Sequence, residues 1–189
     1  SVFFVNRENS KDIREHRSDI LALGGAVYES SLSKSDLHAR RSKSPELDLP
    51  TFIARNSNAA GLIPTAFESL RGRWEDLPGT KKEVEEVGAL FPPLRRTVIT
   101  GHAASEATLQ ELNRTGDLGQ YKYLLFSAHG YLSLHEPALS AIVLSQVETT
   151  PGADGYVTAS EWTAYNLRSE LVVLSACDTG VGKVVQGEG

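Results

Sequence analysis

The sequence predicts an α/β fold in which helices cover both faces of a mostly parallel sheet. Short apolar runs without polar alternation occupy residues 20–23, 124–126 and 171–174. Uninterrupted runs of this length are typical of strands that are buried on both faces. Helical patterns lie between the runs, and alternating helices and strands indicate a three-layer sandwich.

The first strand is expected at Ile20–Leu23, where the apolar run meets Gly24-Gly25. Residues 1–18 are mixed and highly charged, and we interpret them as the possible end of a preceding helical region. Residues 29–65 are rich in Ser, Asn, Pro and basic residues and are expected to form a long loop. The main domain is therefore expected to cover residues 19–189.

A first helix is predicted from about Lys81 to Leu90. Thr80 and Glu83 match the capping-box pattern T-x-x-E, and Pro92-Pro93 should stop the helix. A short strand is expected next, at residues 97–100. A second helix should then begin after Ser105, which is a favourable N-cap residue.

Three further strands are expected in the second half of the chain, at residues 121–128, 141–144 and 171–175. The turn signal at residues 151–155 predicts a hairpin into Tyr156-Val157. Thr158 and Glu161 again match the capping-box pattern and predict a helix through about Asn166.

Composition excludes several classes of function. The chain has 189 residues and a net charge of -5, which argues against nucleic acid or an anionic membrane as the main partner. No apolar run approaches the roughly 18 residues that a membrane helix needs. The single cysteine, Cys177, excludes an intrachain disulfide and favours a reducing, cytoplasmic setting.

Two reactive side chains follow apolar strands, His129 in Ser-Ala-His-Gly and Cys177 in Ser-Ala-Cys-Asp. In open α/β sheets, catalysis is found beyond the carboxyl ends of the strands. The two residues are 48 positions apart, close to the spacing of about 50 in caspases. An imidazole can take the proton of a thiol and later protonate a leaving amine, so the pair predicts a cysteine nucleophile with a histidine base.

The same segments supply candidate oxyanion donors. Gly130 has no side chain and can bring its N–H close to a substrate, and the Cys177 N–H is the natural second donor. Both reactive residues lie close to a glycine, so we expect the backbone to turn sharply there and expose them.

Other interpretations are weaker. A buried cysteine and a hydrogen-bonded histidine can each be purely structural. Cys177 to Val184 resembles a phosphate loop, but it lacks the first glycine and the final hydroxyl residue. His135 and Glu136 lack the further ligands of a metal site, so we expect neither metal nor cofactor.

Six segments occur in the order seen in CHAT domains, a family of caspase-like (clan CD) cysteine peptidases often joined to TPR helical repeats. They are residues 77–84 (LPGTKKEV), 101–109 (GHAASEATL), 125–130 (LFSAHG), 139–144 (LSAIVL), 154–161 (DGYVTASE) and 171–189 (LVVLSACDTGVGKVVQGEG). The chain resembles that family most specifically in its last nineteen residues.

The resemblance implies a caspase-like sandwich with His129 as general base and Cys177 as nucleophile. Asp178, beside the nucleophile, could face the substrate pocket and favour basic residues, or serve only in a local turn. The family's domain continues past the final Gly-Glu-Gly, so the fold is expected to be incomplete at its C-terminal end. The absence of Met also indicates an excised or processed piece.

The sequence therefore predicts a cysteine endopeptidase that cleaves protein substrates through a thioester, as the regulated module of a larger protein. The expected partners are a protein substrate, a TPR-like helical region and the C-terminal remainder of the domain, with neither nucleic acid nor membrane bound. The alternative is a CHAT-fold scaffold or interaction module whose catalytic pair is unused.

Overall fold

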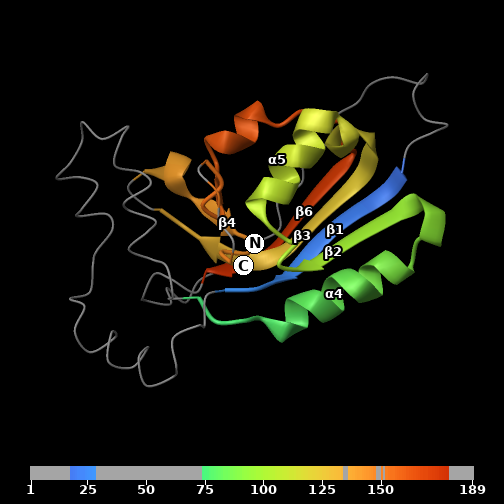
Figure 1. Cartoon of the computed structure of the whole chain (residues 1–189), viewed down its shortest axis with the longest axis horizontal. Coiled ribbons are helices and arrows are strands. Elements are labelled where there is room, and N and C mark those ends of the chain that lie inside the picture. Colours follow the sequence, from blue (N-terminus) through green and yellow to red (C-terminus); the bar gives the residue numbers. More distant parts are fainter. Residues whose placement is uncertain (1–17, 29–73, 134–135, 148–149, 151, 179–189) are drawn as a thin grey trace, which may run out of the picture.

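The computed structural model describes residues 18–28, 74–133, 136–147, 150 and 152–178. In these residues the chain forms a six-stranded mixed sheet with helices on both faces (Figure 1). The strands are β1 (Ser18–Ala26), β2 (Arg96–Gly101), β3 (Tyr121–Tyr131), β4 (Ala141–Val143), β5 (Tyr156–Thr158) and β6 (Leu171–Asp178). The helices are α4 (Pro78–Ala89) and α5 (Glu106–Thr115), with 3-10 turns at Pro93–Arg95, Asp117–Gln120, Pro137–Leu139 and Glu161–Ala164.

The centre of the sheet is parallel, as the apolar runs predict. β1 pairs with β2 and β3, and β6 pairs with β3 along its whole length, all in parallel. Ser127 of β3 pairs with both Gly24 of β1 and Ser175 of β6, so β1 and β6 lie on opposite edges of β3. β4 and β5 add an antiparallel hairpin beyond the end of β1, which makes the sheet mixed.

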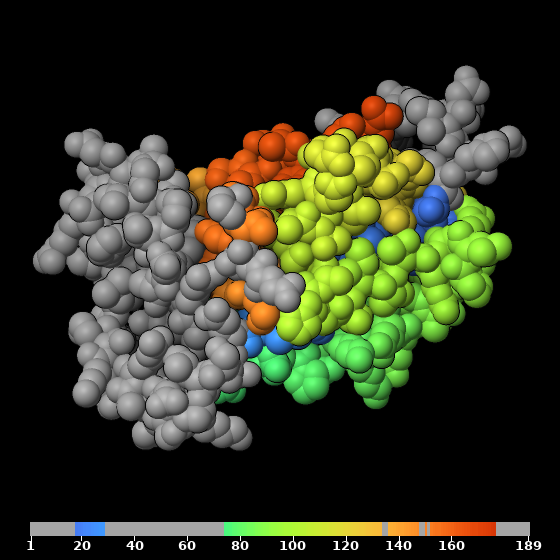
Figure 2. Space-filling model, viewed as in Figure 1, coloured from blue at the N-terminus to red at the C-terminus, as the bar shows by residue number. Residues whose placement is uncertain are grey.

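The two helices bury opposite faces of the sheet. Val84 of α4 packs in one cluster with Ile20 and Leu125, whereas Leu109 of α5 packs in another with Leu21. Neighbouring residues of a strand point to opposite faces, so each apolar run supplies both clusters. In the space-filling view α5 covers much of the face shown, and little of β1 reaches the surface (Figure 2).

The expected start of the first helix is wrong in detail. α4 begins at Pro78, and its N-cap Leu77 makes no side-chain capping bond. Proline is favoured in the first turn of a helix because its missing N–H has no partner there. Thr80 therefore lies inside the helix, where its hydroxyl donates to the Leu77 carbonyl and accepts from the Gly25 N–H.

The other two helix starts agree better with expectation. Ser105 caps α5 by accepting a hydrogen bond from the Thr108 N–H at 3.2 Å, as predicted. Thr158 and Glu161 exchange the two hydrogen bonds of a capping box. That box, however, opens a 3-10 turn, Glu161–Ala164, instead of the predicted helix through Asn166.

The described helices are too short and too polar to cross a membrane. The first seventeen residues and residues 29–65, for which a preceding helix end and a long loop are expected, lie outside the described part of the chain. Ser18 already belongs to β1.

Candidate functional site

His129 and Cys177 come together at the carboxyl end of the parallel strands. They are register partners on β3 and β6, two rows beyond the pair formed by Ser127 and Ser175. On its other side His129 pairs with Val143 of β4. The backbone thus places the two candidate catalytic residues on adjacent strands at one end of the sheet.

The imidazole of His129 is oriented by a backbone carbonyl. Its Nε2 lies 2.7 Å from the carbonyl oxygen of Glu75, in the segment that leads into α4. A carbonyl oxygen can only accept a hydrogen bond, so Nε2 carries the hydrogen in the neutral ring. The lone pair of a neutral imidazole in this tautomer is on Nδ1, which is then the proton acceptor.

Two aromatic rings pack against the imidazole. Tyr28, just after β1, meets it edge to face at a centroid distance of 5.0 Å, and Trp74 lies against it at 4.9 Å. Both rings are held by hydrogen bonds, from the Tyr28 hydroxyl to the Val143 carbonyl and from Trp74 Nε1 to the Tyr156 hydroxyl, each 2.8 Å long. His129 is consequently only 4% exposed.

This burial sets the charge of the histidine. Desolvation lowers the pKa of the His129 imidazole, and the hydrogen bond to the Glu75 carbonyl offsets part of that shift. Burial also raises the pKa of Tyr28, whose hydroxyl therefore stays a hydrogen-bond donor. Near neutral pH the imidazole is uncharged and can accept a proton.

The expected sharp turn beside the histidine is wrong. β3 continues through Gly130 to Tyr131, and Gly130 is not among the described glycines with a positive φ. The strand continues because β4 pairs with it there, Gly130 opposite Ile142. Gly130 is also the register partner of Asp178, the last residue of β6, so both lie one row beyond the candidate pair.

Sequence reasoning missed the residues that hold His129. Trp74 is 7% exposed, and it packs against the candidate base. Tyr28 carries no motif. Glu75 acts through its main chain, which leaves no signal in the sequence.

Other candidate features lie elsewhere. His102 is exposed, and His16, His38 and His135 lie outside the described residues. Within the described part of the chain, no three potential ligand side chains cluster as a metal site would require.

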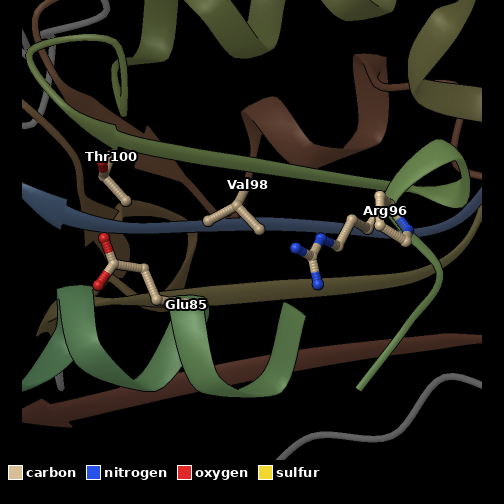
Figure 3. Close-up of a pocket in the computed structure, with 5 residues that line it drawn as sticks. Glu85, Arg96, Val98 and Thr100 are labelled. Carbon is tan, nitrogen blue, oxygen red and sulfur yellow. The ribbon is translucent and has the colours of Figure 1, made fainter. Parts of the chain in front are cut away.

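A pocket of about 470 Å³ lies between α4 and the edge strand β2, lined by Glu85, Pro93, Arg96, Val98 and Thr100 (Figure 3). It contains neither His129 nor the residues that contact it. The guanidinium of Arg96 is used within the fold, where it donates to the carbonyls of Gly88 and Phe91 at the end of α4.

Comparison with known families decides the relationship. The sequence profile of the CHAT domain matches residues 9–189. The chain belongs to the CHAT-domain family. The match extends the resemblance seen in six separate segments over nearly the whole chain. CHAT domains are a caspase-like family. Neither the curated proteins nor the solved structures gave a match to this CHAT domain.

Proposed function

We propose that this CHAT domain is a cysteine endopeptidase in which Cys177 is the nucleophile and His129 the general base. The register pairing of these two residues on β3 and β6 carries the proposal. Membership of a caspase-like family supports it independently. The fold is then a caspase-like sandwich in which the ends of β3 and β6 form the catalytic edge.

The first half of the reaction uses the tautomer fixed by Glu75. Nδ1 of His129 accepts the proton of the Cys177 thiol, since Nε2 already holds a hydrogen toward the carbonyl. The thiolate attacks the carbonyl carbon of the substrate peptide, a C–S bond forms, and the negative charge moves onto the oxygen. Nδ1–H then protonates the amine as the C–N bond breaks, which leaves a thioester on Cys177.

Water completes the cycle. Nδ1 takes a proton from a water molecule whose oxygen attacks the thioester carbon. The C–S bond then breaks, Nδ1–H returns its proton to the Cys177 sulfur, and the carboxyl product leaves. In both halves the oxyanion needs N–H donors, and we assign these to Gly130 and Cys177. Asp178, in register with Gly130, is the candidate for contact with a basic residue of the substrate.

A thiol-reactive peptide probe tests the proposal. We expect a peptidyl acyloxymethyl ketone to label Cys177, as located by peptide mass spectrometry, and His129→Ala to abolish the labelling. Glu86→Ala is a matched control, because exposed Glu86 forms an ion pair with Lys82, which is also exposed on α4. A probe with a basic residue at its carboxyl end should label faster than one with an acidic residue, and Asp178→Asn should narrow that difference.

The scaffold alternative predicts another result. If Cys177 reacts no faster than an ordinary exposed thiol, and equally fast with and without His129, the pair is not a catalytic unit. The chain would then act by binding partners through the CHAT fold. We also propose that this CHAT domain acts in the cytoplasm and cleaves protein substrates. A TPR-like helical region is proposed to regulate it.

A further inference from the structure

One carboxylate joins α4 to both strands that carry the candidate pair. Oε2 of Glu83 accepts a hydrogen bond from the hydroxyl of Ser127 on β3 and another, at 3.1 Å, from the hydroxyl of Ser175 on β6. Ser127 and Ser175 are register partners, and each lies two residues before its strand's catalytic candidate, His129 or Cys177. The two strands thus share an anchor one pleat before the proposed site.

The burial of these groups makes the contact hard to replace. Ser127 is fully buried, and a buried hydroxyl without a partner is costly. Glu83 is half-buried and reaches the same face of the sheet as the apolar cluster around Val84 and Leu125. Water therefore has limited access to replace the carboxylate.

The position of Glu83 is itself fixed, because α4 is seated very closely on the sheet. A Cβ on Gly24 would lie 2.7 Å from the Thr80 carbonyl oxygen and 2.7 Å from a methyl group of Val84, so only glycine allows the approach. Gly25, with φ of +60°, donates its N–H to Thr80. Near the other end, Gly88 of α4 lies against Val98 in the same way.

We propose that Glu83 is a positioning residue, which holds β3 and β6 in the alignment that brings His129 to Cys177. The inference rests on the proposed peptidase function. The close packing of α4 on Gly24 fixes the distance of the Glu83 carboxylate from the sheet. That carboxylate accepts hydrogen bonds from Ser127 and Ser175, which are register partners. A small displacement of reacting groups by a residue outside the chemistry can cost as much as about a hundredfold in rate.

Kinetics of Glu83 variants test the proposal. Glu83→Ala should lower kcat between about tenfold and a hundredfold with little change in KM, since substrate contacts remain. Glu83→Gln should retain most of the rate, because its amide oxygen can still accept hydrogen bonds from the hydroxyls of Ser127 and Ser175. Ser175→Ala, which removes one hydroxyl without a large change in volume, should give a smaller loss. Glu86→Ala, on the exposed face of α4, should have no effect.

The outcomes separate positioning from general stability. Urea unfolding identifies conditions under which every variant is fully folded, and the kinetics are compared there. An unchanged kcat for folded Glu83→Ala would overturn the proposal. So would equal losses in the Ala and Gln variants, because rescue by the isosteric amide is what hydroxyl binding requires.

A second measurement does not depend on turnover. Amide hydrogen exchange at His129 and Cys177 should become at least about tenfold faster in folded Glu83→Ala than in the Glu86→Ala control. If the wild-type protein has no peptidase activity but this exchange difference is observed, the proposed function fails and the alignment role of Glu83 stands. If the exchange rates are equal, the alignment role fails.

Discussion

The indole of Trp74 lies against the imidazole of His129, with the two ring centroids 4.9 Å apart. Trp74 precedes His129 by 55 positions and belongs to the short segment that enters α4. The next residue, Glu75, supplies the carbonyl that holds Nε2. One segment therefore both desolvates the candidate base and fixes its tautomer.

Truncating this indole should change the histidine as well as the stability. Trp74→Ala should raise the pKa of His129 toward the ordinary value of 6.5, because desolvation is the main cause of the lowered pKa. It should also lower the free energy of unfolding by about 3–5 kcal/mol. NMR titration of the assigned His129 ring proton measures the first effect, and urea unfolding the second. Trp74→Phe keeps a ring in place, so an equally raised pKa in that variant would contradict this account.

The lowered pKa of His129 also predicts the acid limb of activity. The neutral imidazole accepts the thiol proton, so activity should fall only when the pH drops below the folded-state pKa, which lies under 6.5. The profile of kcat/KM against pH should have its acid midpoint below 6.5, and Trp74→Ala should shift that midpoint upward. A wild-type midpoint above 6.5 would show that His129 is not buried as the structure has it.

Variants of the candidate pair should be strongly non-additive. Cys177→Ala and His129→Ala should each remove nearly all turnover, and the double variant should be little worse, since two groups that act as a unit are lost together. Cys177→Ser should be close to inactive, because a hydroxyl is a much weaker nucleophile at neutral pH. Peptide cleavage by the four proteins is the measurement. Loss of activity on chelation and its recovery with zinc would argue for a different mechanism.

A buried carboxyl away from His129 should make stability depend on pH. Glu106, the first residue of α5, is 2% exposed and accepts hydrogen bonds from the Gly155 N–H and from Gln110. Burial raises its pKa to about 7, the hydrogen bond from Gly155 opposes the shift, and the charges of Glu161 and Asp154 add to it. The folded chain therefore holds this proton to a higher pH than the unfolded chain does.

The sign of the effect follows from proton binding. Between pH 4.5 and about 7 the folded state binds more protons at Glu106, so the free energy of unfolding should fall as pH rises through this range, by up to about 3 kcal/mol. Glu106→Gln keeps an acceptor for Gly155 and should remove this contribution, with its largest relative gain above pH 7. Urea unfolding of both proteins from pH 5 to 8 measures the difference. Parallel curves over the whole range would show that the group titrates normally.

The sequence predicted the elements whose causes are local. The apolar runs identified β1, β3 and β6, and the Ser105 cap identified the start of α5, because each depends on neighbouring residues alone. The start of α4 was missed since Pro78 overrides the capping pattern at Thr80. Glu83, expected to close that capping box, binds two serines of the sheet instead.

The surroundings of the candidate pair could be predicted only in part. Two strand ends with reactive residues predicted that His129 and Cys177 would share an edge, and the register of β3 and β6 agrees. The contacts that orient the histidine come from Tyr28 and from the Glu75 carbonyl, which lie far away in sequence and form no motif. The role of Gly24 is likewise visible only once α4 is seen against it.

The free edge of β6 leads to the last prediction. Among the described strands β6 pairs with β3 alone, and Leu171 to Ala176 are each half-buried, whereas most residues of β3 are buried. An apolar strand with one unpaired edge exposes N–H and C=O groups that a further strand can bind. We expect that strand to come from the C-terminal remainder of the domain, beyond Gly189, or from a processed second chain.

Hydrogen exchange can test this directly. The amides of β6 should exchange at least about tenfold more slowly in a polypeptide that includes the native downstream segment than in residues 1–189 alone, because pairing protects an edge strand. The amides of β1, which is paired on both sides, serve as the internal control and should differ little. Residues 1–189 that are monomeric, cooperatively folded and fully active, with β6 already protected, would show that the edge needs no further strand.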